Sequence, residues 1–335
     1  MKKRSFALLS SAALLMSYQA HAYDLSWEDF EAEDMALITK ATNSNDPEVL
    51  FQAGSFLIDN SIMQDGLDLG HEYIERAVKA GHDGAEAVKA DMEYSEGNYK
   101  KALELFHKAE ASQDPYVLYS LGVMYFDGEG TDANVSKGND YYLKAAKLGS
   151  DDAMYQLAFS YNDGVGVTQD YTKAAYWFEQ AANKQNVSAM YNLGVSYLNG
   201  EGVETSCKKA MHWLEQAIEF DEHPRSFAKM GDIYYYPEYK QRCGFKTTDY
   251  AQAFAFFEKA AMLDNVYAQY MVGYAYRNGH GIPSDFVKAL AWFEIADENG
   301  DEDAAKEIRD VKQYMSEEHI AKSEQYKESI TDEIW

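Results

Sequence analysis

The chain has 335 residues, 46% of them hydrophobic and 26% charged, which is an ordinary composition for a globular protein. Its 56 acidic residues outnumber its 30 Lys and Arg residues, so the formal net charge is −26 at pH 7. Such a charge is repelled by nucleic-acid phosphates and by anionic lipid. We therefore expect no nucleic-acid binding and no electrostatic membrane binding, and a partner that is neutral or basic.

Residues 1–22 have the pattern of a secretory signal peptide. Lys2, Lys3 and Arg4 precede an apolar run over residues 6–16, and Ala20 and Ala22 supply the small residues of a cleavage site. Cleavage after Ala22 removes three of the 30 basic residues and no acidic one, so the charge becomes −29. No later stretch has the roughly 18 uninterrupted apolar residues of a membrane span. We expect a periplasmic protein without membrane insertion, and secretion is the alternative.

Three segments follow before the clearest pattern begins. Residues 23–46 form an acidic N-terminal segment. Residues 47–112 hold two divergent copies of the repeat described next, over residues 48–81 and 83–112. In the second copy, Tyr99, Ala102, Phe106 and Ala109 have the spacing of an amphipathic helix.

A motif recurs over residues 113–300. A Tyr-containing segment followed by an Asp/Asn-Gly-x-Gly loop begins at Tyr119, Tyr155, Tyr191 and Tyr270. A small residue recurs in phase, at spacings of 36, 36, 37 and 42 residues: Gly122, Ala158, Gly194, Gly231 and Gly273. Paired alanines and aromatic residues follow each copy. Self-similarity at this period indicates five stacked structural repeats.

Each repeat is predicted to contain two amphipathic helices. Ala289, Trp292, Phe293 and Ala296 stand at i, i+3, i+4 and i+7, which places them on one helical face. The recurring small residue would let the paired helices approach closely, and the Gly-x-Gly loop would end the first helix at positive φ. Because one helix pair cannot bury its apolar face alone, successive pairs must stack.

These motifs resemble the Sel-1-like repeat family, a relative of the tetratricopeptide repeat with a longer, glycine-bearing loop. The resemblance implies an all-α, right-handed α/α solenoid of about seven helix pairs. The repeat containing Gly231 departs from the pattern, because its loop is lengthened over residues 237–245 and lacks Gly-x-Gly. We expect residues 301–335 to form capping helices at the C-terminal end of the stack.

The family resemblance also indicates where a partner would bind. A stripe on the first helix of each repeat would lie on the concave wall, where tetratricopeptide stacks hold peptides. Its candidate residues are Tyr119, Val123, Phe126, Tyr155, Phe159, Asn162, Tyr191, Val195, Tyr270, Tyr274 and Arg277. Packing of these side chains against the neighbouring repeat is the alternative. Tyr suits an interface because it offers apolar area with a polar tip.

Cys207 and Cys243 are the only cysteines. In an oxidising compartment an even pair favours a disulfide over two free thiols. Their 36-residue separation places them in or beside equivalent loops of neighbouring repeats. A bridge there would fix the irregular loop.

The sequence offers little for catalysis or cofactors. The glycine loops do not continue into a Gly-Lys-Ser/Thr sequence, and the histidines have no metal-ligand spacing, so we expect no cofactor and no metal site. Ser226-Phe-Ala-Lys229, Ser160-Tyr-Asn162 and Lys246-Thr-Thr248 approximate three motifs of penicillin-binding and β-lactamase-like proteins, in scrambled order.

We therefore expect a non-catalytic scaffold or regulator that binds a protein or peptide. A cell-wall-active or β-lactam-recognising enzyme is the alternative. Glycan or peptidoglycan binding by the Tyr-lined surface is a third possibility.

Overall fold

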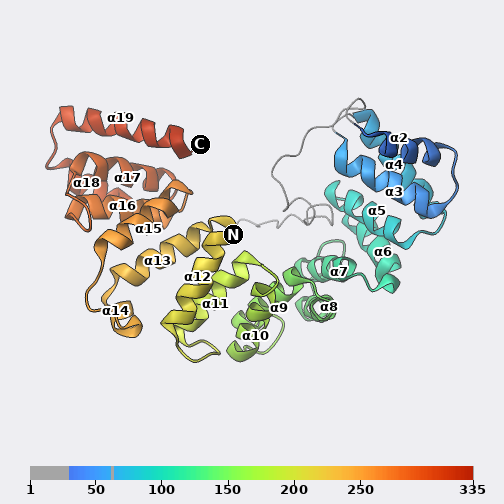
Figure 1. Ribbon diagram of the computed structural model, residues 1–335, viewed down its shortest axis with the longest axis horizontal. Coiled ribbons are helices and arrows are strands. Elements are labelled where there is room, and N and C mark those ends of the chain that lie inside the picture. Colours follow the sequence, from blue (N-terminus) through green and yellow to red (C-terminus); the bar gives the residue numbers. More distant parts are fainter. Residues whose placement is uncertain (1–29, 62–63, 335) are drawn as a thin grey trace. The chain divides into compact units, whose positions relative to one another are not determined.

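The computed structural model describes residues 30–61 and 64–334, and its regular secondary structure over these ranges is helical throughout (Figure 1). The predicted signal peptide, residues 1–22, lies outside the described residues, as do residues 23–29 of the predicted acidic segment. The chain divides into two compact units, Met1–Gln169 and Asp170–Trp335. No helix in the described ranges has both the length and the apolar character needed to cross a membrane.

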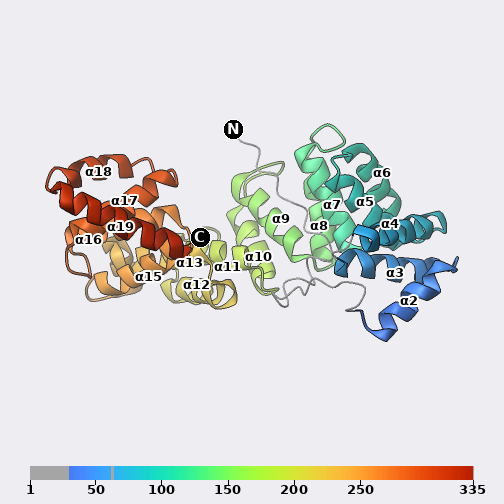
Figure 2. The same ribbon diagram turned by 90° about the horizontal axis from the view of Figure 1, so that it is seen from above.

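The first unit contains helices α2 to α9. Their bounds are α2 Ala32–Thr42, α3 Pro47–Asn60, α4 Gln64–Lys79, α5 Asp83–Ser95, α6 Tyr99–Ala109, α7 Pro115–Asp127, α8 Val135–Lys147 and α9 Asp151–Asp163. A short 3-10 turn, Glu110–Ser112, follows α6. Helix α3 pairs with α4, α5 with α6 and α7 with α8, and successive pairs pack on one another (Figure 2). Helix α2 shows that the predicted acidic segment contains a helix.

The second unit contains helices α10 to α19. Their bounds are α10 Tyr171–Ala182, α11 Val187–Asn199, α12 Cys207–Asp221, α13 Pro224–Tyr235, α14 Pro237–Cys243, α15 Tyr250–Met262, α16 Val266–Asn278, α17 Phe286–Glu298, α18 Ala304–Lys312 and α19 Glu317–Ile334. Helix α11 pairs with α12, α13 with α15 and α16 with α17, while α18 and α19 both pack on α17. The all-α solenoid of stacked helix pairs is confirmed, with α18 and α19 at its C-terminal end.

The recurring small residue provides close helix approach, as predicted. A Cβ added at Gly122 would lie 2.5 Å from the ring of Tyr142, and one at Gly231 would lie 2.5 Å from the ring of Phe257. The aromatic rings of the second helices therefore occupy the space that a side chain on the first helix would fill. Gly54 and Gly70 also lie at a close approach, between α3 and α4, although neither belongs to the predicted in-phase series.

Helix starts explain part of the acidic composition. A side-chain oxygen at the N-cap accepts a hydrogen bond from a backbone N–H of the first turn, which satisfies a donor that has no partner within the helix. Among the described helices, five aspartates do this: Asp46, Asp114, Asp170, Asp249 and Asp285. Ser150, Asn186, Ser206 and Asn265 cap other helices in the same way.

The Gly-x-Gly loops have two structural roles. The first glycine is the left-handed C-cap of a first helix, for example Gly200 with φ of +78°. The second glycine also has positive φ and lies against the start of the second helix of the preceding repeat. A Cβ at Gly202 would lie 1.9 Å from the backbone oxygen of Tyr171. The loop therefore joins neighbouring repeats as well as ending a helix.

Candidate functional site

A pocket of about 340 Å³ opens on the first helices of the second unit. We call it the first-helix pocket. Its lining residues come from α11, α13 and the start of α16, which follow one another in the stack (Figure 1): Tyr191, Arg225, Ala228, Lys229, Asp232, Asn265 and Tyr267. Tyr191 is one of the candidate residues predicted above, and Ala228 and Asp232 occupy the same stripe positions on their own first helix. Three successive repeats are thus needed to build this pocket.

One side of the first-helix pocket carries an arginine over an aromatic ring. The guanidinium carbon of Arg225 lies 4.5 Å from the centroid of the Tyr191 ring, which is a cation–π geometry. His223 lies 5.4 Å from the same ring, measured between ring centroids. Burial and the nearby Arg225 lower the pKa of His223, so the exposed Arg225 supplies the positive charge at this side.

The opposite side is a hydrogen-bonded network around a buried carboxylate. Asp232 is 6% exposed, and its Oδ2 accepts from Lys229 Nζ at 2.6 Å. Its Oδ1 accepts from the Tyr267 hydroxyl at 2.8 Å, and Tyr236 donates to that hydroxyl at 3.1 Å. Although burial disfavours its charged form, Lys229 has a raised pKa because Asp232 stabilises the ammonium. The network fixes the pocket wall. Arg225 is then the charged lining residue with no ion-pair partner in the described part of the chain.

Sequence reasoning missed Arg225, Lys229 and Tyr267. This part of the first-helix surface is locally cationic, although the chain as a whole is strongly acidic. A sequence pattern could have indicated the two basic residues, because Arg225 and Lys229 are four residues apart on one helical face. Ala228 and Asp232 lie beside them. Tyr267 could not be placed without the stacking, because it reaches Asp232 from the next first helix.

In the first unit the predicted stripe residues are packed to different degrees. Tyr119 and Phe126 contact the ring of Tyr142 on α8, at centroid distances of 5.7 and 5.9 Å, and Val123 is buried. Burial raises the pKa of Tyr119, whose hydroxyl interacts with Gln156 of α9. On α9 itself, Tyr155 and Asn162 are half-buried and Phe159 is 44% exposed.

In the second unit the remaining stripe residues lie on α11 and α16. Val195 is half-buried beside Tyr191 on α11. Tyr270 and Tyr274 have ring centroids 6.2 Å apart, and Tyr270 also contacts Phe293 of α17. Arg277 forms an ion pair with Glu307 of α18. This charge is therefore engaged within the C-terminal end of the stack.

The Tyr-to-Asp link of the first-helix pocket has a counterpart in the first unit. Tyr116, the second residue of α7, donates its hydroxyl to Asp91 of α5, just as Tyr267, the second residue of α16, donates to Asp232. Over the described ranges, Asp91 has no lysine partner equivalent to Lys229. Burial raises its pKa to about 7, even though the Tyr116 hydrogen bond acts in the opposite direction.

We expect the stability of the chain to fall between about pH 4 and pH 7 through Asp91. Because the folded-state pKa lies above the unfolded value, the stabilising protonated form is lost as the pH rises through the folded pKa. Relative to the wild type, Asp91→Asn should gain about 2 kcal/mol of unfolding free energy at pH 8 and little at pH 4, allowing for partial solvent screening. Urea unfolding at both pH values measures this. Asp140→Asn, an exposed carboxylate on α8, is the control, and an equal pH trend in both variants would contradict the assignment.

The serine of the enzyme-like motif lies in an unsuitable position. Ser226 is 0% exposed on α13, and its Oγ lies 2.9 Å from His223 Nδ1. Lys229, the lysine of the same motif, is bound to Asp232 instead. Ser160 is buried on α9 of the other unit, and Lys246 to Thr248 lie in a loop. A buried serine whose lysine pairs with a carboxylate offers no accessible nucleophile.

The predicted pairing of the two cysteines is confirmed. A disulfide joins Cys207, the first residue of α12, to Cys243, the last residue of α14. The lengthened loop of this repeat forms the short helix α14, which the bridge attaches to the neighbouring repeat. Arg242 adds a hydrogen bond from its Nη1 to the backbone oxygen of Leu198, at 3.3 Å.

Comparisons with known proteins agree with this architecture. The Sel1 repeat pattern matches residues 92–114, 115–150, 151–186, 187–219, 228–265 and 266–301. A Sel1 repeat protein from Oxalobacter formigenes is similar in structure, with 28% identity, a TM-score of 0.60, and coverage of 66% of this chain and 88% of that one. The protective antigen c5321 of uropathogenic Escherichia coli has 22% identity, a TM-score of 0.50, and coverage of 90% and 80%. No curated protein sequence matches significantly.

Proposed function

The chain belongs to the Sel1 repeat family, and from this premise we propose that it is a non-catalytic scaffold whose first-helix surface binds a polypeptide partner. Repeat folds of this kind present extended surfaces built from successive helix pairs, and they generally bind proteins. The coarse function is therefore protein–protein interaction. The single observation that carries the finer proposal is the first-helix pocket, in which Arg225 stands over Tyr191.

The chemistry of that pocket defines what the partner should offer. Tyr191 and Tyr267 provide aromatic surface, which accepts an apolar side chain with little loss of conformational freedom. Arg225 supplies hydrogen-bond donors in a planar fork, which fits a carboxylate or a peptide carbonyl. A polypeptide segment with an apolar anchor beside an acidic or carbonyl group satisfies both requirements.

We expect a photocrosslinking residue at position 191 to capture the partner, and one at position 176 not to. Tyr176 is a matched control, because it is 52% exposed on the second helix α10 of the same unit. The experiment uses native envelope extracts and mass spectrometry of the crosslinked product. Equal capture from both positions would contradict the proposal.

Substitutions then test the pocket residues in solution with the captured partner. Tyr191→Ala and Arg225→Ala should each weaken binding about tenfold or more, as the loss of a central aromatic or arginine contact usually does. Tyr176→Ala should leave it unchanged, and circular dichroism should show the same helical content in all three. Combining Tyr155→Ala with Tyr191→Ala asks whether the stripe of the first unit also contributes. Wild-type affinity in Tyr191→Ala and Arg225→Ala would exclude the pocket as the contact surface.

The proposed site of action is the periplasm, reached through the signal peptide of residues 1–22. The basic start, the apolar run and the small residues at positions 20 and 22 support it. N-terminal sequencing of the protein from an osmotic-shock fraction should return a sequence beginning at Tyr23. A protein that retains Met1 in that fraction would contradict cleavage after Ala22.

A further inference from the structure

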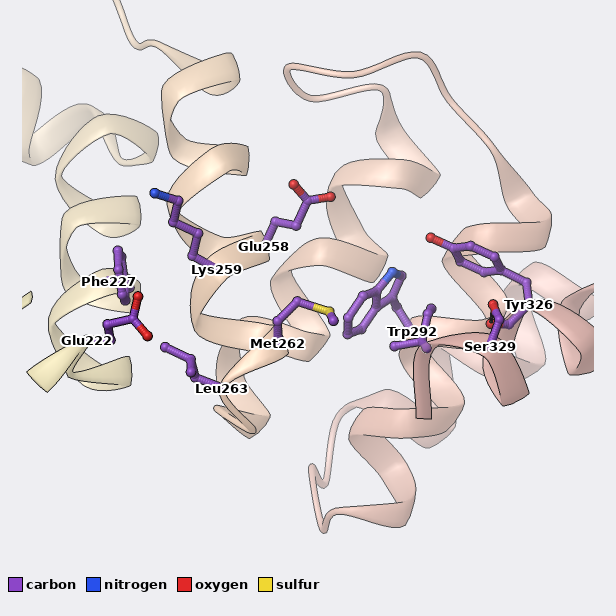
Figure 3. Close-up of a pocket in the computed structure, with 10 residues that line it drawn as sticks. Glu222, Phe227, Glu258, Lys259, Met262, Leu263, Trp292, Tyr326 and Ser329 are labelled. Carbon is purple, nitrogen blue, oxygen red and sulfur yellow. Dashed lines mark hydrogen bonds between the residues drawn. The ribbon is translucent and has the colours of Figure 1, made fainter. Parts of the chain in front are cut away.

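A second and larger pocket, of about 510 Å³, lies on the other row of helices in the second unit. We call it the second-helix pocket. It is bounded by α15 and α17, which are second helices of their repeats, by the start of α13 and by the C-terminal helix α19. Figure 3 shows Met262 and Trp292 at its centre, with Phe227 and Leu263 toward one end and Tyr326 and Ser329 toward the other. None of the residues of the first-helix pocket lines it.

The inner surface of the second-helix pocket is apolar and closely packed. Phe227, Trp292 and Ile330 are 5%, 2% and 5% exposed, while Leu263 at the edge is 38% exposed. Trp292 lines this space (Figure 3), and hydrogen bonds within the described residues make no use of its indole N–H. The volume suits one or two large apolar groups, and the N–H offers a donor to a carbonyl oxygen beside them.

The wall contributed by α19 is held firmly in place. Lys327 of α19 donates to Glu298 of α17 at 2.7 Å, and Lys288 of α17 lies 5.2 Å from the centroid of the Tyr326 ring. Ile330 is itself buried. Because these contacts exist without a ligand, binding would cost little reordering of the wall.

The rim of this pocket is acidic. Glu222 and Glu258 line it, and a neighbouring hollow that shares Glu222 and Leu263 adds Glu219 and Asp221. Lys259 is the one basic residue in the lining, and its ammonium lies 5.5 Å from the centroid of the Phe227 ring. Burial raises the pKa of Glu258, although the nearby Lys288 acts in the opposite direction, so a further cation would still stabilise its ionised form.

We propose that the second-helix pocket binds a polypeptide segment in which a bulky apolar side chain stands next to Lys or Arg. The apolar side chain enters between Met262 and Trp292, and the basic residue meets the carboxylates of Glu222 and Glu258. The charge of the rim selects this occupant over an acidic one. The pocket is independent of the first-helix pocket, so one chain can hold two different segments.

The test uses defined synthetic peptides and the full chain with methyl-¹³C methionine. One nine-residue peptide carries a phenylalanine between two arginines, a second has glutamates in place of the arginines, and a third has glycine in place of the phenylalanine. The Met262 methyl resonance is assigned through Met262→Leu. The first peptide should shift this resonance saturably, and the other two should bind at least tenfold more weakly. No shift with the first peptide at millimolar concentration, or equal shifts with all three, overturns the proposal.

Variants separate the rim from a general charge effect. Glu222→Lys combined with Glu258→Lys should weaken the arginine peptide at least tenfold. Glu179→Lys combined with Glu215→Lys changes the net charge equally at repeat-equivalent positions of α10 and α12 and should have no effect. Ser329→Phe, which fills the pocket from α19, should also remove binding. Equal loss in both charge pairs would contradict the proposal, and so would loss in Tyr191→Ala, because the peptide would then occupy the first-helix pocket.

Discussion

Replacing Gly202 with alanine is expected to lower the free energy of unfolding by about 3 kcal/mol. Two costs add. The φ of +73° disfavours any side chain, and the new Cβ would lie 1.9 Å from the backbone oxygen of Tyr171. Relief of that contact requires the loop to move away from the start of α10, which weakens the junction between two neighbouring repeats. Urea and thermal unfolding followed by circular dichroism measure the change.

Gly279→Ala is the matched control for this prediction. Gly279 has nearly the same φ, +71°, but the nearest atom to an added Cβ is the Ile282 oxygen at 3.6 Å. Its substitution should therefore cost about 1 kcal/mol, the conformational part alone. Equal losses in the two variants would show that the approach to Tyr171 contributes nothing to stability.

The contrast between Gly202 and Gly279 shows which features of the loops could be predicted from the sequence. The in-phase Gly-x-Gly motif correctly predicted loops that end the first helices at positive φ. It could not distinguish the two glycines of one motif, because the contact of Gly202 is made with the preceding repeat, 31 residues earlier in the chain. Contacts between repeats depend on the stacking geometry, which the period alone does not specify.

The candidate site could likewise be predicted only in part, because it depends on contacts between repeats. The family resemblance placed Tyr191 in the predicted binding stripe, and the structure brings Arg225 of the next first helix over its ring. Periodicity within one helix cannot show which residue of the next helix lies opposite, so Arg225 and Tyr267 were missed.

The acidic composition was also only partly explained from the sequence. The five capping aspartates are structural, whereas Glu222 and Glu258 bound a pocket that forms only when α19 packs against α17.

Removing the disulfide by Cys207→Ser with Cys243→Ser is expected to lower the free energy of unfolding by about 3 to 4 kcal/mol, following the entropy of closing a loop of this length. The bridge spans 36 residues, and that loop contains the whole of α13, the helix that carries Arg225 and Lys229. Helix α14 has no buried residue of its own. Without the bridge, little besides the Arg242 hydrogen bond would hold it against α12.

Unfolding of the variant should therefore begin at α14, and trypsin cleavage can detect this local opening. Lys240 and Arg242 lie on this helix, so cleavage there should accelerate at least tenfold in the double serine variant, before α13 or α15 opens. Reductant should produce the same acceleration in the wild type and none in the variant, which separates the bridge from effects of the serines. Unchanged cleavage after verified reduction would mean that packing alone holds α14. The disulfide would then stabilise the chain only by constraining its unfolded state. Because α13 connects α14 to the first-helix pocket, partner binding measured in parallel reports whether the bridge also fixes the geometry of Arg225 and Tyr191.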